Sequence, residues 1–107
     1  MNVDNFSIDS NTKLLCLIGN PVEHSMSPLM HNIALRDLNL NYVYVAFDVL
    51  PENLKKALDG IKVLNIKGIN VTIPHKQEIV HYLDQVDPIA KKIGAVNTIK
   101  NENGFLI

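Results

Sequence analysis

The feature that most constrains this chain is the stretch at residues 68–76, which reads Gly-Ile-Asn-Val-Thr-Ile-Pro-His-Lys. Apolar Ile69, Val71 and Ile73 alternate with polar residues, which is the pattern of a strand buried on one face. Pro74 then ends the strand, because it cannot donate to a sheet, and it suits the first turn of a helix. The stretch therefore predicts a strand that runs directly into a helix.

Lys76 has an unusual place in that predicted helix. The apolar stripe at Ile79, Val80 and Leu83, continued back by one turn, reaches Lys76, so the amine is expected to face inward. A lysine in the first turn also opposes the helix dipole. Both effects would lower its pKa, as general acid–base catalysis requires. On this helix alone we favour a simpler interpretation, in which the lysine stem covers the edge of the core.

Strands and helices alternate along the rest of the chain. Strands are expected at residues 13–18, 41–48, 68–73 and 95–100, with a returning strand at 105–107 after an Asn-Gly turn. Helices are expected from Ser27 as N-cap, from Pro51, from Pro74, and from Asp87 as N-cap. The alternation predicts a single three-layer α/β domain, with a mixed, mainly parallel sheet and helices on both faces.

The predicted helices carry apolar faces that are expected to pack inward. These faces are Met30, Ile33, Ala34 and Leu38 in the first helix, Leu54, Ala57, Leu58 and Ile61 in the second, and Ile89, Ala90 and Ile93 in the last. The second helix is expected to end near Gly60, because glycine weakens a helix. Residues 1–12 are polar and are expected to form a loose lead-in to a domain at residues 13–107.

The composition is that of one ordinary globular domain. The chain has 107 residues, 47% of them hydrophobic, and a net charge of −1 with its basic residues dispersed, so no nucleic-acid or membrane surface is expected. Cys16 lies in an apolar run and is expected to be buried, which suits a reducing compartment. Because we find no signal peptide and no membrane-spanning run, we expect a cytoplasmic protein.

Small polar residues gather around the ends of the predicted strands. They are His24, Ser25 and Ser27 after the first strand, Asn70, Thr72 and Lys76 around the third, and Asn97 and Thr98 in the segment after residue 94. Open α/β sheets bind ligands beyond the carboxyl ends of their strands. Hydroxyls, amides and one amine suit a polyhydroxylated, anionic small molecule, whose carboxylate the serines at a helix N-terminus would hold.

Each of these residues also has a purely structural explanation. Ser27 could simply cap its helix, Thr72 could be an ordinary strand residue, and Asn97 could bond loop backbone. All four histidines could lie on the surface: His24, His31, His75 and His81. No histidine pair has a further ligand at metal-binding spacing, so no metal is expected. Neither Gly-x-Gly-x-x-Gly nor Gly-x-x-x-x-Gly-Lys-[Ser/Thr] occurs, so no nucleotide site of either kind is expected.

Three segments of the chain, in order, resemble the N-terminal substrate-binding domain of the shikimate dehydrogenase family. They are Gly-Asn-Pro-Val-Glu-His-Ser-Met-Ser-Pro at 19–28 with His31-Asn32, the stretch at 68–76, and Ile-Gly-Ala-Val-Asn-Thr at 93–98. Together they span nearly all of the chain from residue 14. The resemblance implies a parent enzyme that interconverts 3-dehydroshikimate and shikimate with NADPH.

The resemblance also implies a role for each matching residue. It implies that Ser25 and Ser27 bind the substrate carboxylate. It implies that Thr72, Lys76 and Asn97 contact the ring hydroxyls and the reacting oxygen. Lys76 would be the catalytic lysine, which reverses the simpler interpretation that its helix alone favoured.

The family pattern includes parts that this chain does not contain. The family pairs its lysine with an aspartate in a Gly-x-Asn-Thr-Asp segment, and the chain stops at Ile107 before that segment would begin. The NADP-binding domain is missing too, and the final strand is cut, which favours a domain taken from a longer protein. We therefore expect NADP to bind the full-length protein, no cofactor to bind this chain, and no dehydrogenase activity from it alone.

Other functions share some of these features. A quinate/shikimate dehydrogenase using NAD or NADP would have the same motifs, because the residues that select the cofactor lie in the missing domain. A stand-alone module could bind a shikimate-like acid without chemistry. A purely structural domain would leave Lys76 and the polar strand ends unexplained. The exposed final strand could also pair with a second copy, so a homodimer is a partner to consider.

Overall fold

The computed structural model describes residues 7–107. The first half of the expected lead-in, residues 1–6, lies outside this range. Within the second half, Thr12 Oγ1 donates to Asn41 Oδ1 at 2.7 Å, and Asn41 Nδ2 donates to Asp9 Oδ1 at 3.2 Å. These bonds attach the turn that precedes the first strand to the residue that precedes the second.

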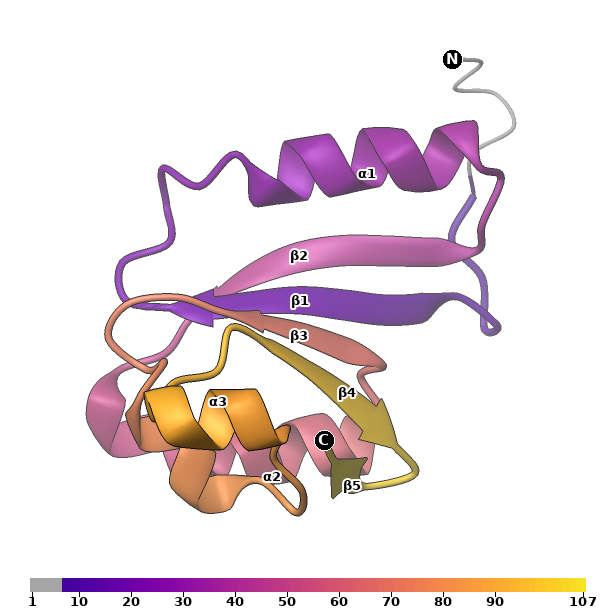
Figure 1. Ribbon diagram of the computed structural model, residues 1–107. Coiled ribbons are helices and arrows are strands. Elements are labelled where there is room, and N and C mark those ends of the chain that lie inside the picture. The colour runs from indigo at the N-terminus through magenta and orange to yellow at the C-terminus, as the bar shows by residue number, and fades with distance from the viewer. Residues whose placement is uncertain (1–6) are drawn as a thin grey trace.

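Five strands form one mixed sheet in the order β2-β1-β3-β4-β5 (Figure 1). Their bounds are β1 (Lys13–Gly19), β2 (Tyr42–Asp48), β3 (Gly68–Val71), β4 (Thr98–Glu102) and β5 (Phe105–Leu106). β1 pairs in parallel with both β2 and β3, whereas β4 is antiparallel to β3 and to β5. The predicted mixed sheet is confirmed, although its fourth strand begins at Thr98 rather than at residue 95.

Helices lie on both faces of the sheet, as Figure 1 shows. α1 (Ser27–Asp37) covers one face, against β2 and β1. The other side carries η2 (Pro51–Asn53), α2 (Leu54–Leu64), η3 (Glu78–Tyr82) and α3 (Pro88–Ile93). The predicted three-layer α/β domain is therefore confirmed.

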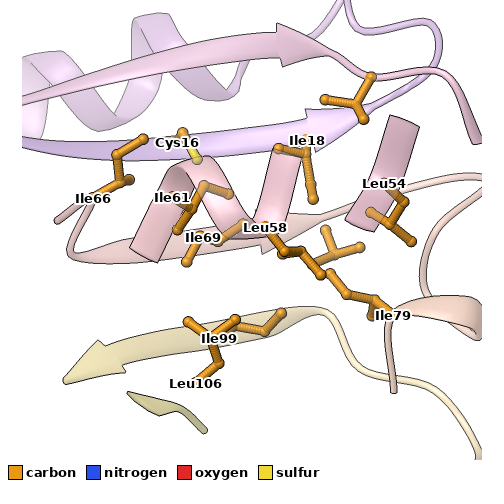
Figure 2. Packing of buried hydrophobic residues seen from close by; sticks show 12 residues of the cluster. Cys16, Ile18, Leu54, Leu58, Ile61, Ile66, Ile69, Ile79, Ile99 and Leu106 are labelled. Carbon is orange, nitrogen blue, oxygen red and sulfur yellow. The ribbon is translucent and has the colours of Figure 1, made fainter. Parts of the chain in front are cut away.

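The core lies between the sheet and α2 (Figure 2). Leu54, Leu58 and Ile61 of α2 are at most 4% exposed and pack among side chains of the sheet. The strands contribute Cys16, Ile18, Ile69, Val71, Ile99 and Leu106. Cys16 is fully buried, as expected, and burial raises the pKa of its thiol to about 12.

The rotation of α1 contradicts its sequence pattern. Met30, Ile33, Ala34 and Leu38 were predicted to face inward, but all four are exposed. Asn32 faces the sheet instead: it donates to the carbonyl of Tyr44 and accepts from the N–H of Tyr44, each at 2.8 Å. Because β2 is an edge strand, these backbone groups have no neighbouring strand to bond. Satisfying that edge, rather than burying the apolar stripe, sets the rotation of α1.

α2 is longer than the sequence predicted from Gly60. It buries its predicted apolar face but continues past Gly60 to Leu64, and it ends at Asn65, whose φ of 56° is left-handed. A single interior glycine costs only about 1 kcal/mol. Burial of the helix face outweighs that cost, so the predicted stop near Gly60 is wrong.

The last elements have the predicted ends but not the predicted packing. Asp87 accepts from the N–H of Ala90 at 3.4 Å, and Gly94 ends α3 with a φ of 78°. Ile89 and Ile93 are 67% and 71% exposed, however, because α3 borders a hollow instead of packing its stripe on the sheet. The predicted Asn-Gly turn is confirmed, since residues 103 and 104 both have positive φ, at 54° and 92°.

The stretch at 68–76 forms the predicted strand without the predicted helix. β3 ends at Val71, the Ile73–Pro74 peptide bond is cis, and Ile73 is 73% exposed rather than facing the core. Helical structure resumes only at Glu78, as the 3-10 helix η3. After β3, Thr72 donates to Ile18 O and Ile73 O accepts from Asn20, both at 3.0 Å. Pairing with β1 and its following loop therefore holds this segment in an extended turn.

Candidate functional site

A hollow of about 270 Å³ lies beyond the carboxyl ends of β1 and β3. It is lined by Leu17, Pro21, Val22, His24, Ser25, Ser27 and Thr72, and we call it the serine hollow. It brings together Ser25, Ser27 and Thr72, three of the five residues predicted for the site. This is the edge at which open α/β sheets bind their ligands.

The N-terminus of α1 opens onto the serine hollow. Ser25 Oγ accepts from the N–H of Ser27 at 3.2 Å, and Ser25 N–H donates to Val22 O at 3.0 Å. Met26, not Ser27, occupies the N-cap position, and no side chain caps it there, so the predicted cap role of Ser27 is wrong. The two hydroxyls lie instead beside the positive end of the helix dipole, which favours an anion.

Lys76 and Asn97 line a second, larger hollow of about 540 Å³. What we call the lysine hollow is completed by mainly apolar residues between 83 and 96, by the polar Gln85, Asp87 and Thr98, and by Ile107. Lys76 is exposed in the turn before η3, so its predicted position on the inner side of a first helical turn is wrong. The carbonyl of Lys76 accepts from the N–H of Val96 at 2.9 Å, which holds the lysine backbone next to Asn97.

A backbone hydrogen bond links the surroundings of the two hollows at the end of β3. Val71 N–H donates to Asn97 O at 2.9 Å, and Thr72, the next residue, lines the serine hollow. The five predicted residues are thus placed near one strand end, in two hollows rather than in one.

A chain of hydrogen bonds that the sequence did not reveal runs beneath this site. The Tyr44 hydroxyl donates to Asn70 Oδ1 at 2.8 Å, and Asn70 Nδ2 donates to Thr98 Oγ1 at 3.2 Å. Asn70 and Thr98 stand out as polar residues near strand ends, but Tyr44 resembles any aromatic strand residue. The signal that could have found it is register, because Tyr44 and Asn70 lie on the same face of the sheet once β1 is paired between their strands.

His75 is a buried residue rather than a surface one. It is 1% exposed, and its Nε2 donates to the carbonyl of Val49 at 2.6 Å. Its backbone N–H also donates to Thr72 O at 3.0 Å. His75 therefore fixes the turn that separates Thr72 from Lys76, and the surface interpretation of this histidine is wrong.

Residues 7–107 contain no group of three His, Cys, Asp or Glu side chains that could hold a metal ion. In the same part of the chain, no helix combines the length and the apolar character that crossing a membrane requires.

Comparison with known proteins shows which family this chain belongs to. Residues 17–99 match the model of the shikimate dehydrogenase substrate binding domain. The chain belongs to this family. The match includes all three segments that carried the resemblance, which is thereby confirmed.

Individual members of the family are closely similar. Shikimate dehydrogenase (NADP(+)) of Methanocaldococcus jannaschii is 66% identical over 100 residues, which cover 94% of this chain and 36% of that protein. A crystal structure of shikimate dehydrogenase in complex with NADP+ has a TM-score of 0.91 at 64% identity, covering 94% of this chain and 35% of that one. Shikimate 5-dehydrogenase from Listeria monocytogenes, solved with shikimate and NAD, has a TM-score of 0.91 at 44% identity, covering 98% of this chain and 36% of that one.

This chain therefore spans about 36% of the length of the curated relatives it matches. NADP is the cofactor that those relatives' names imply. The residues of this chain do not fit NADP by themselves, because no Gly-x-Gly-x-x-Gly turn occurs in it to approach a pyrophosphate. The two hollows present hydroxyl, amide and amine groups, and no glycine among residues 7–107 lines either of them.

Proposed function

We propose that this chain is the substrate-binding part of an NADP-dependent shikimate dehydrogenase, which interconverts 3-dehydroshikimate and shikimate. The observation that carries the proposal is the serine hollow, where Ser25, Ser27 and Thr72 meet at the N-terminus of an 11-residue helix. Membership of the family supports the substrate class. A relative solved with shikimate supports it further.

The serine hollow is the proposed site of the substrate carboxylate. Two hydroxyls can each donate one hydrogen bond to a carboxylate oxygen, and the dipole of α1 adds a favourable field. No acidic side chain lines this hollow to repel an anion. Charge-assisted hydrogen bonds of this kind contribute about 1.5–3 kcal/mol each, so the carboxylate is expected to supply much of the affinity.

The lysine hollow is the proposed place of the reacting oxygen. When a ketone becomes an alcohol, its carbon receives a hydride and its oxygen a proton. The Lys76 ammonium can hydrogen-bond that oxygen and supply the proton, while Thr72 and Asn97 hold neighbouring ring hydroxyls. The hydride would come from NADPH bound by a part of the protein outside this chain.

The remaining parts of the proposal concern the chain as a whole. We infer that it has no dehydrogenase activity alone, because no part of it fits the nucleotide. A cytoplasmic location is proposed on the ground that its single cysteine is a buried free thiol, as is usual in a reducing compartment. A homodimer is the oligomer proposed for testing, with small-molecule acids rather than nucleic acid or membrane as its ligands.

A calorimetric titration with shikimate and with shikimate methyl ester tests the proposal. We expect shikimate to bind roughly tenfold or more tightly than the ester, since the ester removes the charge that the serine hollow would hold. Equal affinities for acid and ester would contradict it. A Ser25→Ala, Ser27→Ala double variant serves as the matched control and should lose the preference for the acid.

A second candidate is a dehydrogenase that uses NAD, or one that prefers quinate. The Listeria relative solved with shikimate and NAD favours keeping the first of these. Quinate included in the same titration distinguishes the second, because tighter binding of quinate than of shikimate would point to it. Turnover by the full-length protein with each cofactor decides between NAD and NADP.

A further inference from the structure

Tyr44 is buried on an edge strand and is contacted by two residues of α1. Its side chain is 3% exposed beneath α1. Its ring stacks on His31, with centroids 4.4 Å apart and an angle of 20° between the planes. Asn32 bonds both of its backbone groups at 2.8 Å. Two consecutive residues of α1 therefore fix the direction in which the Tyr44 ring points.

The Tyr44 hydroxyl begins a chain of hydrogen bonds that leads to the lysine hollow. It donates to Asn70 Oδ1 at 2.8 Å. The Asn70 amide nitrogen in turn donates to Thr98 Oγ1 at 3.2 Å, and Thr98 lines the lysine hollow.

This arrangement holds the Asn70 amide at both of its ends. Tyr44 bonds the amide oxygen, and Thr98 bonds the amide nitrogen. Because each hydroxyl can donate or accept, it is the presence of both partners that fixes the side chain. Without the Tyr44 hydroxyl, the amide would keep only its bond to Thr98.

We propose that Tyr44 is a positioning residue for the acid-binding site, holding the Asn70 side chain against Thr98 at the lysine hollow. The inference rests on the proposed function for its ligand, but not for the position of Asn70 itself. Tyr44 touches no substrate in this scheme. It acts through Asn70 and Thr98.

Tyr44→Phe tests this role, because it removes the hydroxyl and keeps the ring on His31. We expect shikimate to bind the variant roughly tenfold more weakly, as when one buried hydrogen-bond partner is removed. Tyr42→Phe is the matched control: Tyr42 lies on the same strand, but it lines a hollow at the other end, with Lys13 5.8 Å above its ring. Its loss of a hydroxyl should leave binding unchanged.

A double-mutant cycle separates positioning from general weakening. In an Asn70→Ala background, adding Tyr44→Phe should weaken binding much less than it does alone, because the amide to be positioned is gone. A variant that only loosens the fold would weaken binding equally in both backgrounds, and that result would overturn the proposal.

NMR of the Asn70 side-chain amide gives a readout that needs no ligand. We expect Tyr44→Phe, but not Tyr42→Phe, to shift and broaden its two N–H resonances. If the wild-type chain binds shikimate and Tyr44→Phe binds it equally well, the positioning role fails while the proposed function stands. If the wild-type chain binds no shikimate, the proposed function fails, and unchanged Asn70 resonances in Tyr44→Phe would overturn the positioning role as well.

Discussion

Gly19 shows at the scale of one residue how the fold builds its site. A Cβ at this position would lie 2.3 Å from Thr72 Cγ2 and 3.0 Å from Val22 Cγ1. Both neighbours line the serine hollow. Only the absence of a side chain lets the end of β1 approach Thr72 this closely.

Gly19→Ala should therefore damage the site and the fold together. Threonine is β-branched and cannot move aside freely, so we expect a loss of about 1–3 kcal/mol in the free energy of unfolding and clearly weaker shikimate binding. Urea denaturation and calorimetry measure the two effects. Gly68→Ala is the control, because its nearest neighbour is the flexible Leu15 Cδ2 at 3.1 Å, away from the site. Equal effects of the two substitutions on binding would contradict this account of Gly19.

Cys16 provides a second residue-scale prediction. Burial raises the pKa of its thiol to about 12, so the reactive thiolate is scarce in the native chain at pH 8. We expect a thiol reagent to label Cys16 at least roughly hundredfold faster in urea than in buffer, because labelling requires unfolding. Similar rates in both conditions would show that Cys16 is not in the core.

For single residues, the sequence predicts which polar side chains lie together better than it predicts the local structure around each of them. Ser25, Ser27 and Thr72 are found from motifs and do lie together. Lys76 was placed by extending a helical period back through Pro74, and the segment is not helical there. Tyr44 was missed because its role depends on a partner 26 residues away, which only the pairing of strands brings near.

At the scale of elements, α1 and α2 show why one apolar pattern held and another failed. α2 faces an apolar sheet surface, and its stripe is buried as predicted. α1 meets the free edge of β2, whose backbone groups need hydrogen-bond partners, and Asn32 supplies them. A helical stripe predicts burial only where the surface opposite it is apolar, and the sequence of a helix does not say what lies opposite.

Gly60 tests the account of α2. It lies within the helix, its φ is not positive, and a Cβ there would meet nothing within 4 Å. We expect Gly60→Ala to raise the free energy of unfolding by about 0.5–1 kcal/mol, since alanine has less backbone freedom to lose. Thermal denaturation should show a higher midpoint.

Gly94→Ala is the matched control for that substitution. Gly94 also has open space around it, but its φ of 78° is left-handed. The same added methyl group should therefore lower stability, because alanine is strained in that conformation. Stabilisation by both substitutions would mean that backbone conformation does not decide their effect.

At the scale of the whole molecule, the order of strands and helices along the sequence was the best guide to the fold class. Alternating strands and helices predicted the α/β class, and the Asn-Gly turn predicted the final hairpin, because both depend on local sequence. The strand order and the division of the site between two hollows depend on long-range pairing, so local pattern could not supply them.

The length of the chain also bears on its activity. The chain corresponds to about 36% of the length of its curated relatives. We expect no NADPH oxidation with 3-dehydroshikimate by the chain alone, even at high protein concentration. Measurable turnover, absent from a Lys76→Met variant, would show that the chain holds the nucleotide after all.

The most direct measurement is an NMR titration of the chain with shikimate, following backbone amides, with Lys76→Ala alongside. We predict shifts concentrated at Ser25, Ser27, Thr72 and Asn97, and weaker binding by the variant. The hollow lined by Lys13, Lys67 and Lys100 at the opposite end of the strands serves as an internal reference and should not respond. Shifts centred there, or none at millimolar shikimate, would contradict a substrate site built by the ends of β1 and β3.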